Sequence, residues 1–233
     1  LFVISIVVMA YGITSCSQSA EVREDRHLDI SAEPIEFIEV YNGSGDVDII
    51  GATDSDTIKA DAEIVVTGST EDDIRSVIEK EAVIELQKRG NRAIAQARFA
   101  KSFFLLELVK GGEKAIHLQL AIPKGIEIRI WDEDGDLYIQ NVRNDVFIDD
   151  EIGDIVIENA EGDIEIHSGE GAILAQRIRG AVDITDASGD IELSDVQGEV
   201  RVTDEQGAIK LTSVTGDVSI LDTAGGITVE RID

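Results

Sequence analysis

Apolar residues recur with a nine-residue period from Gly135 to the end of the chain. Ten of the eleven blocks begin with glycine and one begins with Asn144, and both residue types tolerate the positive φ of a sharp corner. The third position is always Leu, Ile or Val, and the fifth is Ile, Leu or Val except at Ala175. Because side chains alternate along a strand, these two positions share one face. Each block therefore predicts a short strand with one buried face, followed by a turn.

The eighth position of the blocks reveals a longer period. In alternate blocks it is apolar, at Val142, Ala160, Ile178, Val196 and Val214. In the intervening blocks it is mostly polar or small, at Glu151, Gly169, Ala187, Glu205 and Thr223. The unit is thus eighteen residues with two unequal strands, and stacking such units about 4.8 Å apart gives a parallel β-solenoid with a shared core. An antiparallel meander is the alternative, but it gives no reason for a constant phase over eleven blocks.

The fold class predicted is all-β: a parallel β-solenoid (β-helix) over residues 132–233, preceded by an irregular β-rich capping region over 33–131. Thr70 followed by Glu71, Asp72 and Asp73 predicts the start of one helix that runs to about Glu81. Strands are expected around it at 35–40, 45–49, 58–66, 83–87, 93–99, 115–122 and 126–130.

The N-terminus has the pattern of a lipoprotein signal. Residues 1–10 are almost wholly apolar but fall short of the roughly 20 residues that a membrane span needs. Ile13-Thr14-Ser15-Cys16 resembles a bacterial lipobox, although a plain secretory signal with an incidental cysteine is the alternative. We expect a signal peptide over 1–15, lipidation of Cys16 and a polar tether over 16–32. Ser17 in place of aspartate favours the outer membrane by analogy with enterobacterial sorting.

The acidic composition limits the kinds of partner that the protein is expected to bind. The formal charge is −28, from 20 basic and 48 acidic residues. Nucleic-acid binding requires Lys and Arg against phosphates, and anionic bilayers attract basic segments, so neither is expected, and membrane contact should come through the lipid anchor only. Solubility is the simpler reason for the acidity, and an acidic ligand-binding role is the alternative.

Several short motifs suggest a family. NGSGDVDI lies near residues 42–49, an acidic helix begins near Glu71, IPKGIEI precedes the repeat, and GDI or GDV recurs at Gly153, Gly162, Gly189 and Gly216. Over about residues 34–233 the chain resembles the bacterial putative-adhesin domains of unknown function. The resemblance implies a β-helical protein of the cell envelope and supplies no catalytic residues. The apolar cluster Phe103-Phe104-Leu105-Leu106 departs from it, where a polar loop is expected.

Acidic residues fall in one column of the eighteen-residue period, at Asp150, Ser168, Asp186, Asp204 and Asp222. Stacked carboxylates repel, so a cation could stabilise them, which makes these four aspartates weak metal candidates. The simpler interpretation is that each Asp caps its own turn through backbone N–H groups. His27, His117 and His167 lack metal spacing. We expect neither a metal nor a cofactor.

The fourth position of each block should point outward. On one side of the solenoid it reads Tyr138, Val156 and Leu174, an apolar stripe, and the other side has Phe147. An exposed stripe would mark a partner surface. The alternative is that the N-terminal helix or the cluster around Phe103 and Phe104 covers it.

The sequence contains no nucleophile elbow, zinc motif or phosphate loop. The leading hypothesis is a non-enzymatic, surface-tethered binding or scaffold lipoprotein of the bacterial envelope, whose ligand in the envelope or outside the cell is unknown. One alternative is an envelope structural protein that self-assembles through the C-terminal edge, because the repeat is still in phase at the last residue. The other is a polysaccharide-acting β-helix enzyme, for which the many carboxylates could supply a pair.

Overall fold

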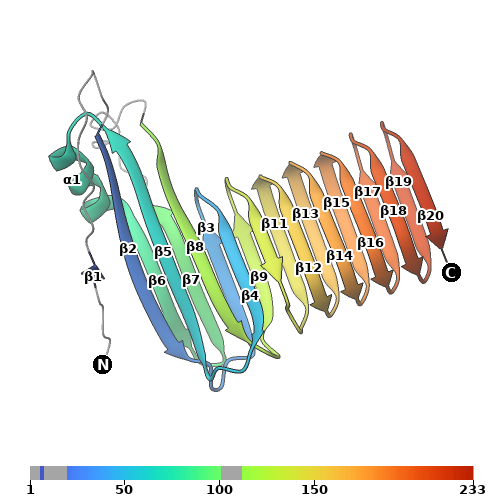
Figure 1. Ribbon diagram of the computed structural model, residues 1–233, viewed down its shortest axis with the longest axis horizontal. Coiled ribbons are helices and arrows are strands. Elements are labelled where there is room, and N and C mark those ends of the chain that lie inside the picture. The colour runs from blue at the N-terminus through green and yellow to red at the C-terminus, as the bar shows by residue number, and fades with distance from the viewer. Residues whose placement is uncertain (1–5, 8–19, 101–111, 233) are drawn as a thin grey trace.

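The computed structural model describes residues 6–7, 20–100 and 112–232. Over this part of the chain, two large β-sheets face each other and form an elongated rod with one helix at its N-terminal end (Figure 1). The space between the sheets is filled by a single cluster of Ile, Val, Leu and Ala side chains. The all-β fold predicted from the sequence is confirmed.

The first sheet has eleven strands, in the order β1 (Ile6–Val7), β2 (Ala20–Ser31), β5 (Thr57–Gly68), β8 (Lys114–Pro123), β4 (Val47–Thr53), β10 (Leu137–Gln140), β12 (Ile155–Glu161), β14 (Ile173–Arg179), β16 (Ile191–Gln197), β18 (Ile209–Thr215) and β20 (Ile227–Ile232). The second sheet has nine, in the order β19 (Val218–Asp222), β17 (Val200–Asp204), β15 (Val182–Ser188), β13 (Ile164–Glu170), β11 (Val146–Ile152), β9 (Glu127–Asp132), β3 (Phe37–Asn42), β7 (Arg92–Phe99) and β6 (Ala82–Arg89).

The repeat region is a parallel β-solenoid with eighteen residues and two strands per coil, as the period predicts. Ile155, Ile173 and Ile191 are direct neighbours on β12, β14 and β16, and all three are buried. Each strand pairs in register with the strand eighteen residues away, so the aliphatic interior runs without interruption along the axis.

A left-handed residue explains why the two strands of a coil differ. In the first sheet the seventh residue of each block has φ between 54° and 63°, at Asn141, Asn159, Arg177, Asp195, Ser213 and Arg231. This kink breaks the alternation of side chains and turns the eighth residue, such as Val196, into the core. In the second sheet the alternation continues, so the seventh residue points inward instead.

The corner glycines are required by the stacking of coils. Gly171 has φ 139°, a region that favours glycine, and a Cβ there would overlap the carbonyl oxygen of Gly153 in the coil below. Any side chain at such a corner would push two coils apart.

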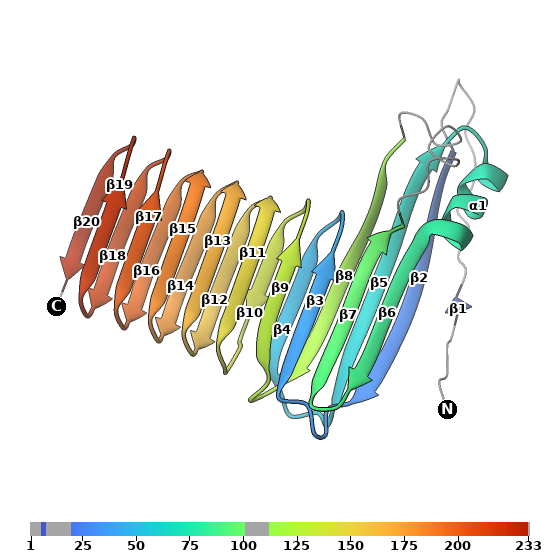
Figure 2. The same ribbon diagram turned by 180° about the vertical axis from the view of Figure 1, so that it is seen from behind.

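Both sheets continue into the N-terminal region. β3 pairs with β9 and β4 pairs with β10, parallel and in register, so residues 37–53 form one more coil of the solenoid. Beyond it the strands lengthen, and β2, β5 and β8 pair antiparallel, as do β6 and β7. Figure 2 shows these longer strands at the broad end of the rod.

The predicted helix is α1 (Glu71–Glu81). The Thr70 hydroxyl accepts a hydrogen bond from the backbone N–H of Asp73 at 3.2 Å, which is the expected N-cap. Ile74, Val77 and Ile78 are buried, and the helix contacts β2, β5 and β6. No helix in the described part of the chain is long and apolar enough to cross a membrane.

The tether predicted over residues 16–32 is wrong from Ala20 onward. Residues Ala20–Ser31 form β2, which pairs with β5 along its whole length. Val22, Leu28 and Ile30 share the inward face with a half-buried ion pair, Glu24 and Arg26. The charged residues at the alternate positions are exposed. This half-buried alternation is the signature of an amphipathic strand, and its high charge made it resemble a polar linker. Cys16 lies outside the described residues.

Candidate functional site

The predicted apolar stripe is a real column on the outer face of the first sheet. Tyr138, Val156 and Leu174 are register neighbours on β10, β12 and β14, and each is half-buried. The Tyr138 hydroxyl donates to Asp136 at 3.2 Å. Helix α1 lies at the far N-terminal end (Figure 1), so it does not cover this column. Phe103 and Phe104 lie outside the described residues, and whether the stripe binds a partner stays a prediction.

The acidic column lies inside the solenoid. Register pairing places its members on successive strands of the second sheet: Asn42, Asp132, Asp150, Ser168, Asp186, Asp204 and Asp222. All are buried except Asp222, which is half-buried. Asn42 and Asp132 extend the column beyond the residues predicted from the repeat, because β3 and β9 belong to further coils of the solenoid.

Burial shifts the ionisation of this column. It raises the pKa of Asp150 to about 8, with the neighbouring Asp132 carboxyl adding to the effect. It also raises the pKa values of Asp132 and Asp186 to about 6. The pKa of Asp204 is raised too, by burial first. Burial therefore stabilises the neutral acid at each of these positions relative to an exposed aspartate, most strongly at Asp150.

The predicted turn-capping role holds for one member. Asp204 accepts a hydrogen bond from the backbone N–H of Gln206 at 3.0 Å. The Ser168 hydroxyl and the N–H groups of Ala187 and Ser188 lower the pKa of Asp186, but both of its carboxyl oxygens lack a hydrogen-bond partner of normal geometry among the described residues. The Asp150 carboxyl is hydrogen-bonded only to the neighbouring Asp132 carboxyl among the described residues.

The metal candidates Asp150, Asp186, Asp204 and Asp222 do not form a cluster of three or more acidic, histidine or cysteine side chains in the described part of the chain. Within the described ranges, no group of three or more His, Cys, Asp or Glu side chains is arranged to hold a metal ion. Their neighbours are one coil above and below, so a single ion would meet two carboxyls of the column at most. Cation binding at these residues stays a prediction.

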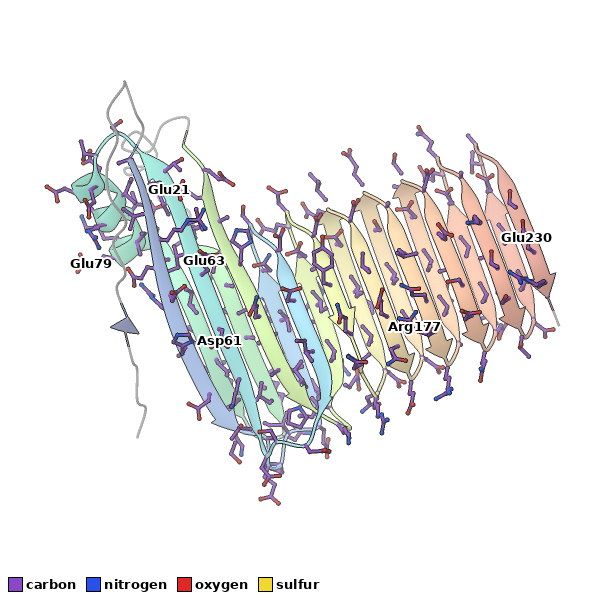
Figure 3. All side chains as sticks on the ribbon, viewed as in Figure 1. Glu21, Asp61, Glu63, Glu79, Arg177 and Glu230 are labelled. Carbon is purple, nitrogen blue, oxygen red and sulfur yellow. The ribbon has the colours of Figure 1, made fainter. Side chains whose placement is uncertain are left out.

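Two of the histidines that looked isolated in the sequence share a cleft. His27 and His117 line a cavity of about 370 Å³ on the outer face of the first sheet, together with Asp25, Asp61 and Glu63. Asp61 and Glu63 project from the same face of β5 (Figure 3). His27 Nδ1 lies 2.5 Å from Asp61 Oδ1, and His117 Nδ1 accepts from the backbone N–H of Asp46 at 3.2 Å. The antiparallel pairing of β2, β5 and β8 brings these residues together, which the residue spacing could not reveal.

The site that the sequence did not predict is aromatic. Tyr41 and Trp131 are register neighbours on β3 and β9, and their rings stack with centroids 5.0 Å apart and planes 11° apart. The ring centroid of Phe147 lies 5.8 Å from that of Trp131 and 5.6 Å from that of His167. The chain has few aromatic residues, at 4% of the total, and this row gathers three of them on the outer face of the second sheet.

Tyr41 and Trp131 line a cleft of about 410 Å³, which we call the aromatic cleft. Its lining residues come from β3, β7, β9 and β11 and the ends of these strands: Tyr41, Asn42, Gln96, Arg98, Trp131, Asp132, Glu133, Asp149 and Glu151. Two of them, Asn42 and Asp132, also begin the buried column. The cleft thus joins an aromatic wall to buried polar groups, an arrangement suited to binding a small polar ligand.

One signal in the sequence could have located this cleft. YNGSGDVDI at 41–49 aligns without gaps with WDEDGDLYI at 131–139. Reading the first segment as an additional coil places Tyr41 beside Trp131, which is the observed register.

A search of curated proteins gives no significant match. Among solved structures, the chain is similar to a putative adhesin from Bacteroides fragilis NCTC 9343, with 16% identity and a TM-score of 0.42 over 89% of this chain and 96% of that one. It is also similar to a putative cell adhesion protein from Clostridium sporogenes ATCC 15579, with 8% identity and a TM-score of 0.31 over 92% of this chain and 100% of that one. A putative lipid binding protein from Parabacteroides distasonis ATCC 8503 has 13% identity and a TM-score of 0.32 over 91% and 97%.

The family resemblance carried by the Gly-Asp-Ile/Val repeats is confirmed, and the matched residues include all of these motifs. The Toastrack DUF4097 family matches residues 30–233, and the protein therefore belongs to that family.

Proposed function

We propose that the protein is a non-catalytic binding module of the bacterial envelope, of the adhesin type, held at the membrane by a lipid on Cys16. The observation that carries the proposal is the aromatic cleft on the outer face of a rigid rod. The lipobox at residues 13–16 supports the anchor. Ser17 supports placement at the outer membrane, and the ligand would be a component of the envelope or of the cell's surroundings.

The rod suits this role because its stiffness holds the cleft in a fixed geometry. Every coil is joined to the next by two parallel strand pairings, and the interior is one continuous aliphatic cluster. A binding surface on such a scaffold loses little conformational entropy when a ligand binds.

The anchor is tested by labelling with a radioactive palmitate in bacteria that produce the protein with its complete signal. We expect label on the wild type and none on Cys16→Ala, together with release of the variant from the membrane fraction. Equal labelling of both proteins would contradict lipidation at Cys16.

The binding role is tested with cells that display equal amounts of wild-type protein or of Tyr41→Ala. We expect the variant cells to adhere less to one another and to an immobilised layer of the same bacterium's envelope material. Unchanged adhesion would contradict the proposal. Release of reducing sugar from that material by the purified wild type would favour the polysaccharide-acting enzyme instead. Assembly through the C-terminal edge stays a prediction.

A further inference from the structure

The aromatic cleft has an unsatisfied polar interior. Asn42 and Asp132 line it and are only 4% and 3% exposed. The Asn42 amide donates to Asp132 Oδ1 at 2.6 Å and to the Gly45 carbonyl at 2.5 Å. This leaves Asn42 Oδ1 without a hydrogen-bond partner among the described residues, whereas the Asp132 carboxyl also accepts a hydrogen bond from the Asp150 carboxyl. An amide oxygen is an acceptor, so a ligand that donates a hydrogen bond to Asn42 Oδ1 would remove the cost of its desolvation.

The charge around the cleft excludes anionic ligands. Its rim carries the exposed carboxylates of Glu133, Asp149 and Glu151 against one cation, Arg98. The chain as a whole has a formal charge of −28. An acidic polysaccharide, a nucleic acid or a phosphate-bearing headgroup would be repelled at this mouth.

The aromatic wall adds a requirement for apolar surface. Tyr41 and Trp131 are half-buried and stacked on each other, so they offer a rigid apolar surface that loses little entropy on binding. The ligand must therefore combine apolar C–H surface with several hydrogen-bond donors. A sugar ring does so: its hydroxyl groups donate, and its ring carbons contact aromatic side chains.

We infer that the aromatic cleft binds a saccharide that carries no acidic group, either a neutral sugar or an amino sugar. This inference rests on the proposed function, because it names the ligand class of the same cleft. Gln96, Arg98 and the rim carboxylates supply both donors and acceptors for hydroxyl groups, and the volume of about 410 Å³ lies in the range of small-ligand sites.

The single tryptophan of the chain provides a direct readout, because Trp131 lines the cleft and no other tryptophan contributes fluorescence. The purified chain is titrated with three probes of similar length: the N-acetylglucosamine trimer, which is neutral, the glucosamine trimer, which is cationic, and trigalacturonate, which is acidic. We expect a saturable change in Trp131 emission with at least one of the first two and none with the third.

A matched pair of variants locates the site. Tyr41→Ala should raise the dissociation constant at least about tenfold, because it removes half of the aromatic wall. Phe37→Ala, which removes a half-buried aromatic residue from the same face of β3 outside the cleft, should leave it unchanged. Circular dichroism checks that both variants keep their fold. If Tyr41→Ala unfolds, protection of Trp131 from acrylamide quenching by the bound trimer in the wild type replaces it.

Three outcomes would overturn the inference: no response to either of the first two probes, a response to trigalacturonate of equal affinity, or equal loss of binding in Tyr41→Ala and Phe37→Ala. The proposed binding function is tested separately, by the adhesion of cells that carry Tyr41→Ala. If no saccharide binds but Tyr41→Ala cells still lose adhesion, the cleft binds a ligand of another class and only the saccharide inference falls.

Discussion

Asp154 accepts a hydrogen bond from the backbone N–H of Ala172, eighteen residues later, at 2.8 Å. Asp136, one coil earlier, accepts from the N–H of Asp154 at 3.0 Å, and Asp190 accepts from Ala208 at 2.9 Å. At the other corner Asp163 accepts from Ala181 at 2.8 Å. Where a corner carries the Gly-Asp motif, its aspartate thus joins one coil to the next, which gives the motif a structural role in this chain.

Replacing Asp154 by alanine should lower the free energy of unfolding by about 1–2 kcal/mol, because a charged acceptor at a corner is lost and the N–H of Ala172 keeps no protein partner. Chemical denaturation measures the change. Asp183→Ala is the matched control, since this exposed aspartate on β15 makes only a 3.9 Å contact with Arg201, and we expect a change within about 0.5 kcal/mol. Equal losses in the two variants would contradict the coil-joining role.

Two adjacent residues on β16 test the facing of the strands. Ile191 is buried between Ile173 and Ile209, so Ile191→Asp places an unpaired charge in the core and should cost several kcal/mol, enough to unfold the solenoid. Glu192 is exposed and bonds Lys210 at 2.6 Å, so Glu192→Lys should cost about 1 kcal/mol or less. Thermal unfolding followed by circular dichroism compares them, and similar losses would mean that the assigned facing is wrong.

The repeat region was predictable because its information is local and repeated. Glycine at the corner and aliphatic residues at positions three and five specify a strand, and their phase specifies the stack. The eighteen-residue period was visible in position eight, but its cause was marked in only half of the coils. Asn141, Asn159 and Asp195 are residue types that favour the left-handed conformation, whereas the equivalent Arg177, Ser213 and Arg231 are not.

The candidate site was less predictable because it depends on long-range pairing. Tyr41 and Trp131 come together because β3 belongs to a coil of the solenoid and pairs with β9. Most of the N-terminal region separates these two strands in the sequence. The buried position of the acidic column follows from side-chain alternation in the second sheet, which continues through position seven. The charged strand β2 was misread as a tether because its four apolar residues are outnumbered by eight polar ones.

A buried ion pair holds the end of α1 to β8. Lys114 Nζ lies 2.7 Å from Glu81 Oε2, and the Glu81 side chain is only 2% exposed. Lys114→Met would leave this carboxylate buried without its cation, and we expect a loss of about 3–5 kcal/mol in the free energy of unfolding. Arg75→Met removes the solvent-exposed i,i+4 pair with Glu71 and should cost about 0.5 kcal/mol or less. If thermal denaturation gives equal shifts for both variants, the buried pair does not stabilise the helix.

The acidic column should make the protein less stable as the pH rises. Asp132 and Asp186 have folded pKa values of about 6 and Asp150 of about 8, all above the ordinary value of 3.8. A raised folded pKa means that the native state binds protons more tightly than the unfolded chain. The stability from these protons is complete below about pH 4 and is lost as the pH rises, first through 6 and then through 8.

The melting temperature should therefore fall between about pH 4 and pH 8 and then level off, measured at constant ionic strength. Asp150→Asn removes the group with the highest pKa and should flatten the upper part of this profile, because an amide stays neutral at every pH in the range. Asp183→Asn makes the same chemical change at an exposed aspartate of β15 and should leave the slope unchanged, because Asp183 does not contribute to the raised pKa of Asp132, Asp150 or Asp186. General repulsion among the surface carboxylates would lower stability equally in both variants, so a selective effect of Asp150→Asn assigns the pH dependence to the interior column. A profile that rises from pH 5 to pH 8 would show that the buried acids are ionised in the native state and held there by partners such as the backbone N–H groups near Asp186.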